Sequence, residues 1–116
     1  MLDKSAVREV VFTPEFKRNL RALAKKYAHI RQDIQPFIEQ IQHSELIGNQ
    51  VQGTGHTIFK ARIRNRDVVR GKSGGYRVIY YLKTATLVIL VTIYSKTEQS
   101  DISVAMIRKI LGEMSK

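Results

Sequence analysis

The spacing between apolar residues changes midway along the chain, from three or four positions to two. Residues 16–41 carry apolar side chains at intervals of three and four, a period typical of amphipathic helices. We therefore predict a helical hairpin of about 30 residues, which begins where Thr13 and Pro14 suit the N-cap and the first helical position. Pro36 lies inside the second half of the hairpin, so that helix either begins near Ile34 or carries a kink.

Residues 58–94 follow the period of β-strands. Apolar and basic residues alternate over 59–64, which predicts a strand with one buried side and one cationic side. Two further apolar runs, 76–82 and 87–94, are separated by a short turn and predict two more antiparallel strands. The last run is so apolar that we expect it inside the sheet.

Two elements at the ends complete the predicted fold. The β-branched run 6–12 predicts a strand at a sheet edge, and the apolar stripe 106–114, capped by Ser103, predicts a C-terminal helix. The glycine-containing stretch 48–57 is predicted as a turn. The order is then β-α-α-β-β-β-α in one α+β domain over residues 1–116, with a four-stranded sheet and helices on one face or around one edge.

Charge is distributed unevenly along the chain. Of 116 residues, 20 are Lys or Arg and 10 are Asp or Glu, for a net charge of +10. Residues 58–96 hold nine of these cations and a single acid, Asp67. Such a concentration predicts a phosphate polymer as the partner.

Several classes of site are disfavoured by composition. The chain has no cysteine, which excludes disulfides and thiolate zinc sites and favours a reducing, cytoplasmic location. We expect no membrane span, because no apolar run approaches 18 residues, and no signal peptide, because the sequence MLDKS (1–5) does not begin one. The three histidines, His29, His43 and His56, have no metal-ligand spacing, and Asp67 alone cannot support a two-metal nuclease. We therefore expect no metal and no cofactor.

The cationic strand supplies the first candidate site. Lys60, Arg62 and Arg64 stand on one side of it at intervals of about 6–7 Å. Arg77 on the next strand can face the same way, and Tyr81 shares its parity and offers a surface on which a base can stack. A solvated sheet face is the alternative, but further cations favour RNA binding, namely Arg66, Arg70, Lys72 and Lys96.

Other candidate side chains have two interpretations each. His56 lies in a glycine-rich loop near the basic strand, as a surface residue or a proton donor. We expect Tyr76 and Tyr80 to be core aromatics. Tyr94 ends the most apolar strand, either in the core or with its hydroxyl at the rim of the basic face.

Three segments resemble a known family. The sequences FKARIR (59–64), SGGYRVIYY (73–81) and IYSKTE (93–98) resemble the RelE/ParE superfamily of bacterial toxins. Within it, the blocks 71–81 and 94–99 are most similar to the HigB-type branch. This resemblance implies a RelE-like toxin of a type II toxin–antitoxin system, an mRNA interferase that enters the ribosome, cleaves mRNA and inhibits translation. It also implies a cognate antitoxin, in this branch usually a helix-turn-helix DNA-binding protein.

The resemblance also implies roles for individual residues. Lys60 and Arg62 match the basic strand of the family's active site, and Arg77 matches the arginine that contacts the scissile phosphate. RelE-type toxins place an arginine and a tyrosine after the last strand, where this chain has Thr97 and Ser103. The candidates to replace them are Lys96 for the arginine and Tyr94 or Tyr81 for the tyrosine.

Cleavage of RNA needs no metal, because the RNA supplies its own 2′-hydroxyl as nucleophile. We expect Lys60 to act as general base, Arg77 to hold the non-bridging oxygens, and Lys96 or Tyr94 to protonate the leaving 5′-oxygen. The remaining cations, Arg64, Arg66, Arg70 and Lys72, would bind RNA backbone. Two other functions stay open: a ParE-like inhibitor of DNA gyrase that cleaves nothing, and a non-catalytic RNA-binding module.

Overall fold

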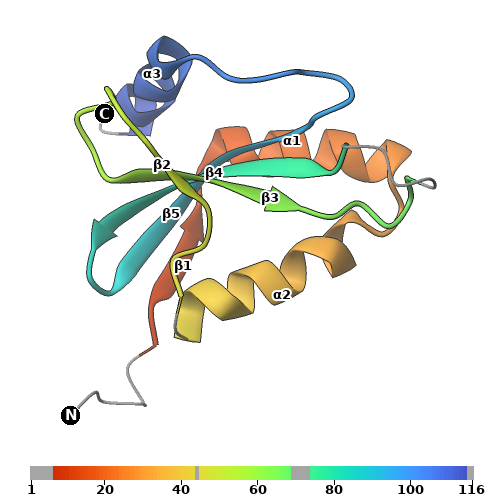
Figure 1. Cartoon of the computed structure of the whole chain (residues 1–116), viewed down its shortest axis with the longest axis horizontal. Coiled ribbons are helices and arrows are strands. Elements are labelled where there is room, and N and C mark those ends of the chain that lie inside the picture. The colour runs from red at the N-terminus through yellow and green to blue at the C-terminus, as the bar shows by residue number, and fades with distance from the viewer. Residues whose placement is uncertain (1–6, 44, 69–73, 115–116) are drawn as a thin grey trace.

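A mixed β-sheet carries helices on both of its faces (Figure 1). The computed structural model describes residues 7–43, 45–68 and 74–114. Within these ranges the elements, in chain order, are β1 (Glu9–Phe12), α1 (Pro14–Lys26), α2 (Ile30–His43), β2 (Asn49–Val51), β3 (Ile58–Ile63), β4 (Tyr76–Thr84), β5 (Leu87–Ser95) and α3 (Val104–Met114). The α+β class is confirmed.

The strands of the sheet follow the order β1-β5-β4-β3-β2. Neighbours from β2 to β5 are antiparallel, and β1 runs parallel to β5. The N-terminal strand therefore lies at an edge and the most apolar strand lies inside the sheet, as predicted. The prediction of four strands was wrong, because β2 adds a fifth within the stretch 48–57 that we expected to be a turn.

The helical hairpin is confirmed, and its start is fixed by Thr13. The Thr13 hydroxyl accepts a hydrogen bond from the Phe16 N–H at 2.9 Å and donates one to the Val91 carbonyl at 2.7 Å. The same side chain thus caps α1 and fastens it to β5. The second helix begins at Ile30 and includes Pro36, so the longer of the two alternatives for that helix is observed.

Two apolar clusters hold the layers together. On one side of the sheet, α1 and α2 cover inward-facing residues of β3, β4 and β5, among them Ala61, Val78 and Tyr80. On the other side, α3 covers Ile58 and Ile79. In Figure 1, α3 lies above the strands and α2 below them. The prediction that helices lie on one face or around one edge is corrected: the C-terminal helix occupies the opposite face, since its apolar stripe matches a second apolar patch on the sheet.

The helix α3 covers only part of its face. Its apolar cluster includes Ile58 of β3 and Ile79 of β4. Further along the same face of these two strands, Arg62 is exposed and Lys60 and Arg77 are half-buried. We call this uncovered part, defined by Lys60, Arg62, Arg77 and Tyr94, the open face. In the described ranges, no helix has both the length and the apolar character needed to cross a bilayer.

Candidate nucleic-acid interface

Three side chains of the open face stand in register across three strands. Arg62 of β3 is paired with Arg77 of β4, and Arg77 is paired with Tyr94 of β5. Directly paired residues point to the same face of a sheet, with Cβ atoms about 5 Å apart. Lys60 precedes Arg62 by two positions and shares this face. The structure therefore brings four of the predicted catalytic residues together.

The turn that enters β4 positions Arg77. One terminal nitrogen of its guanidinium, Nη1, donates to the Gly74 carbonyl at 3.0 Å and to the Tyr76 carbonyl at 3.4 Å. Gly75 has φ +74°, and a Cβ at this position would lie 2.6 Å from the Ile63 carbonyl oxygen, so only glycine fits without distortion. The Nε and Nη2 groups of Arg77 have no partner among the described residues, which leaves two donors for a ligand.

Asp101 joins the open face, and the sequence did not predict it. Its Oδ1 atom accepts hydrogen bonds from the Lys60 ammonium at 3.0 Å, the Tyr94 hydroxyl at 3.3 Å and the Ile102 N–H at 2.8 Å. The other carboxylate oxygen, Oδ2, has no partner in the part of the chain that the structure describes, and the side chain is 62% exposed. One oxygen is thus fixed by three donors, and the other is open to a ligand.

The protonation states of this group are set by its contacts. The hydrogen bond from Lys60 and that from the Ile102 N–H hold the pKa of Asp101 below its usual range. Burial raises the pKa of Tyr94 to about 12, and the Asp101 carboxylate adds to this shift. At neutral pH the face therefore holds an ionised carboxylate beside a protonated phenol. The ion pair also engages Lys60 as an ammonium, whereas a general base needs the neutral amine.

Lys96 lies in the loop between β5 and α3, which also carries Asp101, and its side chain binds back to the backbone of this loop. Its ammonium donates to the Ser100 carbonyl, and the Gln99 amide donates to the Asp101 carbonyl at 3.0 Å. Thr97 and Ser103, which the sequence resemblance places at an arginine and a tyrosine of RelE-type toxins, both make structural contacts. The Thr97 hydroxyl contacts Ser95 at 2.9 Å, and Ser103 accepts from the Met106 N–H at 3.1 Å as the cap of α3. The predicted capping role of Ser103 is confirmed.

The predicted RNA-binding arginines do not gather at the open face as a group. Arg64 is exposed just beyond the end of β3. Arg66 forms an ion pair of 2.7 Å with Asp33 of α2, a carboxylate whose side chain is only 5% exposed. This pair fastens the β3–β4 connection to α2. Arg70 and Lys72 lie outside the described residues.

The next contact of the same connection involves a histidine. Asp67 accepts from the His29 N–H at 2.9 Å and contacts the His29 ring at 2.7 Å. These hydrogen bonds lower the pKa of Asp67 below its usual range. The acid that the sequence showed among the cations of residues 58–96 is therefore paired with the helical hairpin.

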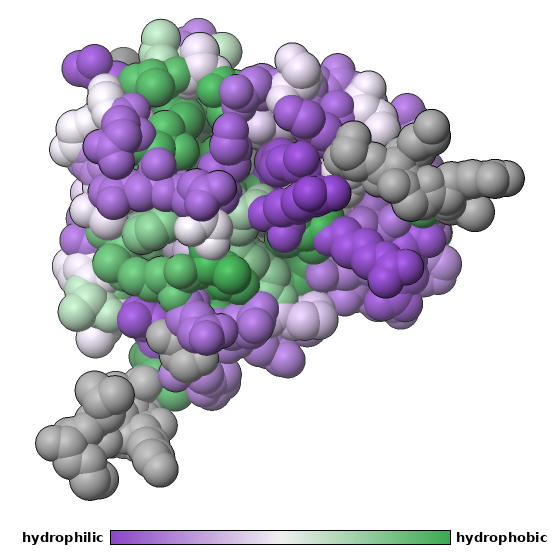
Figure 2. Space-filling model, viewed as in Figure 1, coloured by the Kyte–Doolittle hydropathy of each residue, from purple (hydrophilic) through white to green (hydrophobic). Residues whose placement is uncertain are grey.

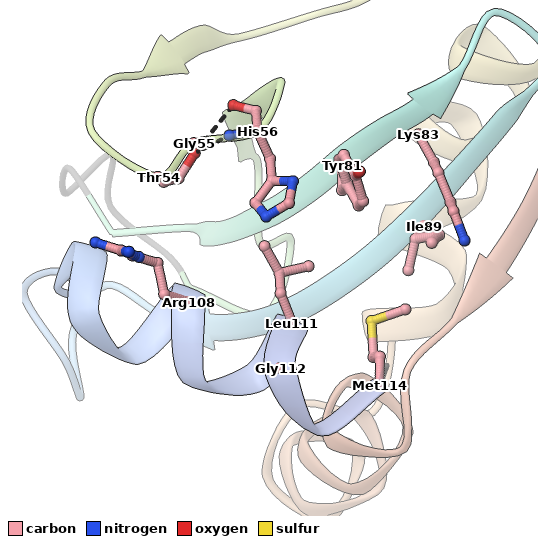
Figure 3. Close-up of a pocket in the computed structure, with 10 residues that line it drawn as sticks. All are labelled: Thr54, Gly55, His56, Tyr81, Lys83, Ile89, Arg108, Leu111, Gly112 and Met114. Atoms are coloured by element: carbon pink, nitrogen blue, oxygen red, sulfur yellow. Dashed lines mark hydrogen bonds between the residues drawn. The ribbon is translucent and has the colours of Figure 1, made fainter. Parts of the chain in front are cut away.

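Tyr81 and His56 lie apart from the open face, in a separate pocket. Their rings meet edge to face, with centroids 5.1 Å apart and planes at 65°. Figure 3 shows both side chains between the β2–β3 connection, β4 and α3, with Leu111 beneath His56. Ile79 and the α3 cluster separate this pocket from Arg77 along β4. The structure thus places Tyr81 and His56 together, but not beside the other predicted site residues.

The other two tyrosines are core residues, as predicted. Tyr76 and Tyr80 are fully buried, and the Tyr80 hydroxyl donates to the Ile47 carbonyl. Tyr94 is also largely buried, but its hydroxyl reaches Asp101 on the open face. Of the two interpretations left open for Tyr94, the structure combines both.

The open face suits a phosphodiester. It presents cations beside an ionised carboxylate and a protonated phenol, so it can bind an anion and exchange protons. Figure 2 shows hydrophilic side chains gathered over the end of β3 and the start of β4 on the right of the view. Among the described residues, no three His, Cys, Asp or Glu side chains form a group that would hold a metal ion. No protein-family model matches the chain.

Proposed function

We propose that this protein is the toxin of a type II toxin–antitoxin system, of the RelE/HigB kind, and cleaves mRNA on the ribosome. The observation that carries the proposal is the register of Arg62, Arg77 and Tyr94 across three strands, beside the Lys60–Asp101 ion pair. A gyrase inhibitor or a passive binder has no need of a carboxylate and a phenol held together within a cationic surface.

The substrate phosphate is bound by the arginines. The free Nε and Nη2 donors of Arg77 match the two non-bridging oxygens of a phosphodiester, and Arg62 supplies a second guanidinium from the paired position. As charge develops on the pentavalent phosphorus, these fixed cations stabilise the transition state more than the ground state.

Asp101 and Tyr94 exchange the protons. The 2′-hydroxyl gives its proton to Asp101 Oδ2 as the bond from 2′-oxygen to phosphorus forms. The bond from phosphorus to the 5′-oxygen breaks, and that oxygen takes the proton of the Tyr94 hydroxyl. The products are a 2′,3′-cyclic phosphate and a 5′-hydroxyl. The carboxyl group of Asp101 then gives its proton back to the Tyr94 phenolate, which lies 3.3 Å from Oδ1 of the same group, and both side chains return to their starting forms.

This assignment replaces Lys60 as the general base. The ammonium of Lys60 orients the carboxylate through Oδ1 and adds positive charge near the phosphate. A role as proton acceptor would first require Lys60 to leave Asp101 and lose its proton.

The test is primer extension on mRNA with purified ribosomes and purified protein. We expect new 5′ ends within the translated region when wild-type protein is present, and none when Arg77→Ala protein is present. Intact RNA that remains bound would instead support the RNA-binding module, and trapped DNA breaks with purified gyrase would support the ParE-like inhibitor. Either result would overturn the proposal.

The proposal includes a cognate antitoxin, a helix-turn-helix DNA-binding protein with an acidic segment that covers the open face. Its charge complements Arg62 and Arg77, which have no acidic partner among the described residues. Expression of the protein alone should stop the growth of bacterial cells, and co-expression of the antitoxin from a neighbouring small reading frame should restore it. If no neighbouring reading frame restores growth, that result would count against this partner.

A further inference from the structure

The outer side of α1 carries a second set of cations, away from the open face. Lys17, Arg21 and Lys25 recur every four residues and are all exposed, while the opposite side of the helix buries Phe16 and Leu20 against the sheet. With a rise of 1.5 Å per residue, successive members stand about 6 Å apart along the helix. We call these three residues the α1 row.

The α1 row is not neutralised within the protein. The neighbouring cations have partners, since Arg18 pairs with Glu15 and Lys26 pairs with Glu98 at 2.8 Å. The side chains of these three residues have no hydrogen bond or ion pair with any described residue. Glu15, the acid of this helix, is already engaged. The row therefore presents its full charge to solvent.

This arrangement is unfavourable for an isolated helix. Like charges at positions i and i+4 destabilise a helix by about 0.2–0.5 kcal/mol per pair, and the row contains two such pairs. A surface that serves only solubility interleaves both signs of charge. A polyanionic partner would offset the repulsion, which makes the row a candidate binding surface.

The surroundings of the row identify the chemistry of that partner. The other exposed residues of α1 are Pro14, Arg18, Ala22 and Lys26, so the described helix exposes no large apolar side chain. Protein interfaces are centred on apolar or aromatic anchors. A nucleic-acid backbone needs none, and the step of about 6 Å suits successive phosphates of one strand.

We propose that the α1 row binds the phosphate backbone of a second RNA segment, separate from the one on the open face. The α1 helix packs in the apolar cluster on one side of the sheet, whereas the open face shares its side with α3. A strand bound to one of these surfaces therefore has the sheet between itself and the other surface. The protein thus holds two RNA segments at once, one on each side of its sheet.

The test measures binding of an RNA hairpin of about 12 base pairs, fully 2′-O-methylated so that no 2′-hydroxyl is available for cleavage. The variant carries Lys17→Gln, Arg21→Gln and Lys25→Gln, which keep good helix formers. The matched control carries Lys83→Gln, Arg108→Gln and Lys109→Gln, three exposed cations elsewhere, so both variants lose the same charge. Circular dichroism melts verify that both are folded.

The expected result is a change in salt dependence. In a plot of log affinity against log KCl concentration, the α1-row variant should lose about two to three units of slope, close to one per phosphate contact. The control should lose much less. Equal losses in both variants, or no loss in the row variant, would overturn the proposal. So would a row variant that binds RNA normally but fails to bind an acidic protein partner.

Failure of this inference is distinguishable from failure of the proposed function. The hairpin assay contains no cleavage step, so its result stands even if the wild-type protein cuts no mRNA. Conversely, an unchanged salt slope would leave the primer-extension result intact.

Discussion

Arg62 and Arg77 face each other as a directly paired couple of like charges on β3 and β4. Such a pair costs stability in an antiparallel sheet, because like charges at directly paired positions repel each other. The described residues place no carboxylate on either side chain. A phosphodiester bound between them would remove the repulsion, so the pair is better explained by ligand binding than by folding.

Loss of the Arg77 guanidinium should slow cleavage strongly. Replacement of Arg77 by alanine removes the two donor nitrogens that we propose bind the phosphate, and we expect the cleavage rate to fall by about 100- to 1000-fold. Arg77→Lys should recover little, because an ammonium cannot make the bidentate contact. Single-turnover cleavage on programmed ribosomes measures both. Arg64→Ala is the control, since Arg64 lies beyond the end of β3 and should affect affinity only.

The pH dependence should identify the proton acceptor. The pKa of Asp101 lies below its usual range and that of Tyr94 is raised to about 12, so both groups keep their active forms between these limits. We expect a flat cleavage rate from about pH 5 to 9, with a fall only at acidic pH below the usual titration range of an aspartate, where the carboxylate is protonated. A rate that rises tenfold per pH unit through neutrality would contradict this and favour neutral Lys60.

Asp101→Asn tests the role of Asp101 as proton acceptor, because asparagine has nearly the same size and shape as aspartate. The amide can still contact Lys60 and Tyr94 but cannot take a proton, so the rate should fall by about 100- to 10,000-fold while RNA affinity is kept or increased. Glu98→Gln is the matched control, because it removes another carboxylate of the same loop. A variant of Asp101 as active as the control would show that the carboxylate is not the proton acceptor.

Gly75→Ala should destabilise the protein next to the site. The residue has φ +74°, which costs an alanine about 1–2 kcal/mol, and its Cβ would also lie 2.6 Å from the Ile63 carbonyl oxygen. Gly55→Ala separates these two effects, because Gly55 has φ +80° but no atom within 4 Å of the added carbon. Urea unfolding should therefore show a larger loss for Gly75 than for Gly55. Equal losses of stability would mean that the backbone near Ile63 shifts at no cost to make room for the added Cβ.

Thr13→Ala should be costlier than Ser103→Ala, although both remove a helix cap. Loss of a cap costs about 1 kcal/mol in either case. Thr13 is buried, and its hydroxyl also donates to the Val91 carbonyl, which would lose this partner in the variant. We expect a difference of about 1 kcal/mol or more in the free energy of unfolding, measured in urea.

The elements with strong periodicity could be predicted from the sequence, and the short or polar ones could not. The alternation over 59–64 correctly placed Lys60 and Arg62 on one face, because the period of a strand fixes side-chain direction locally. The strand β2 has three residues and little apolar pattern. The side of the sheet covered by α3 depends on which apolar patch its stripe meets, and a stripe alone does not specify this.

The contacts that complete the site join residues far apart in the sequence, and they form only when the chain folds. Asp101 lies 41 positions from Lys60, in a loop that the strand pattern does not reach. Arg66 looked like one more cation of the surface, but its partner Asp33 belongs to a helix 33 positions earlier. Counts of charge along the chain also hid the α1 row, because its cations are balanced in sequence by acids that lie elsewhere in space.

The partial cover that α3 provides also limits how large a ligand the open face can contact. The paired residues Arg62, Arg77 and Tyr94 of the open face lie on three neighbouring strands, a width of about 10 Å at the usual strand spacing. The apolar cluster at Ile79 borders them on one side. That width accommodates one phosphate with the sugars on either side. Under the proposed function, a preference for particular codons would then arise from one or two bases, or from the ribosome that presents the strand to the protein.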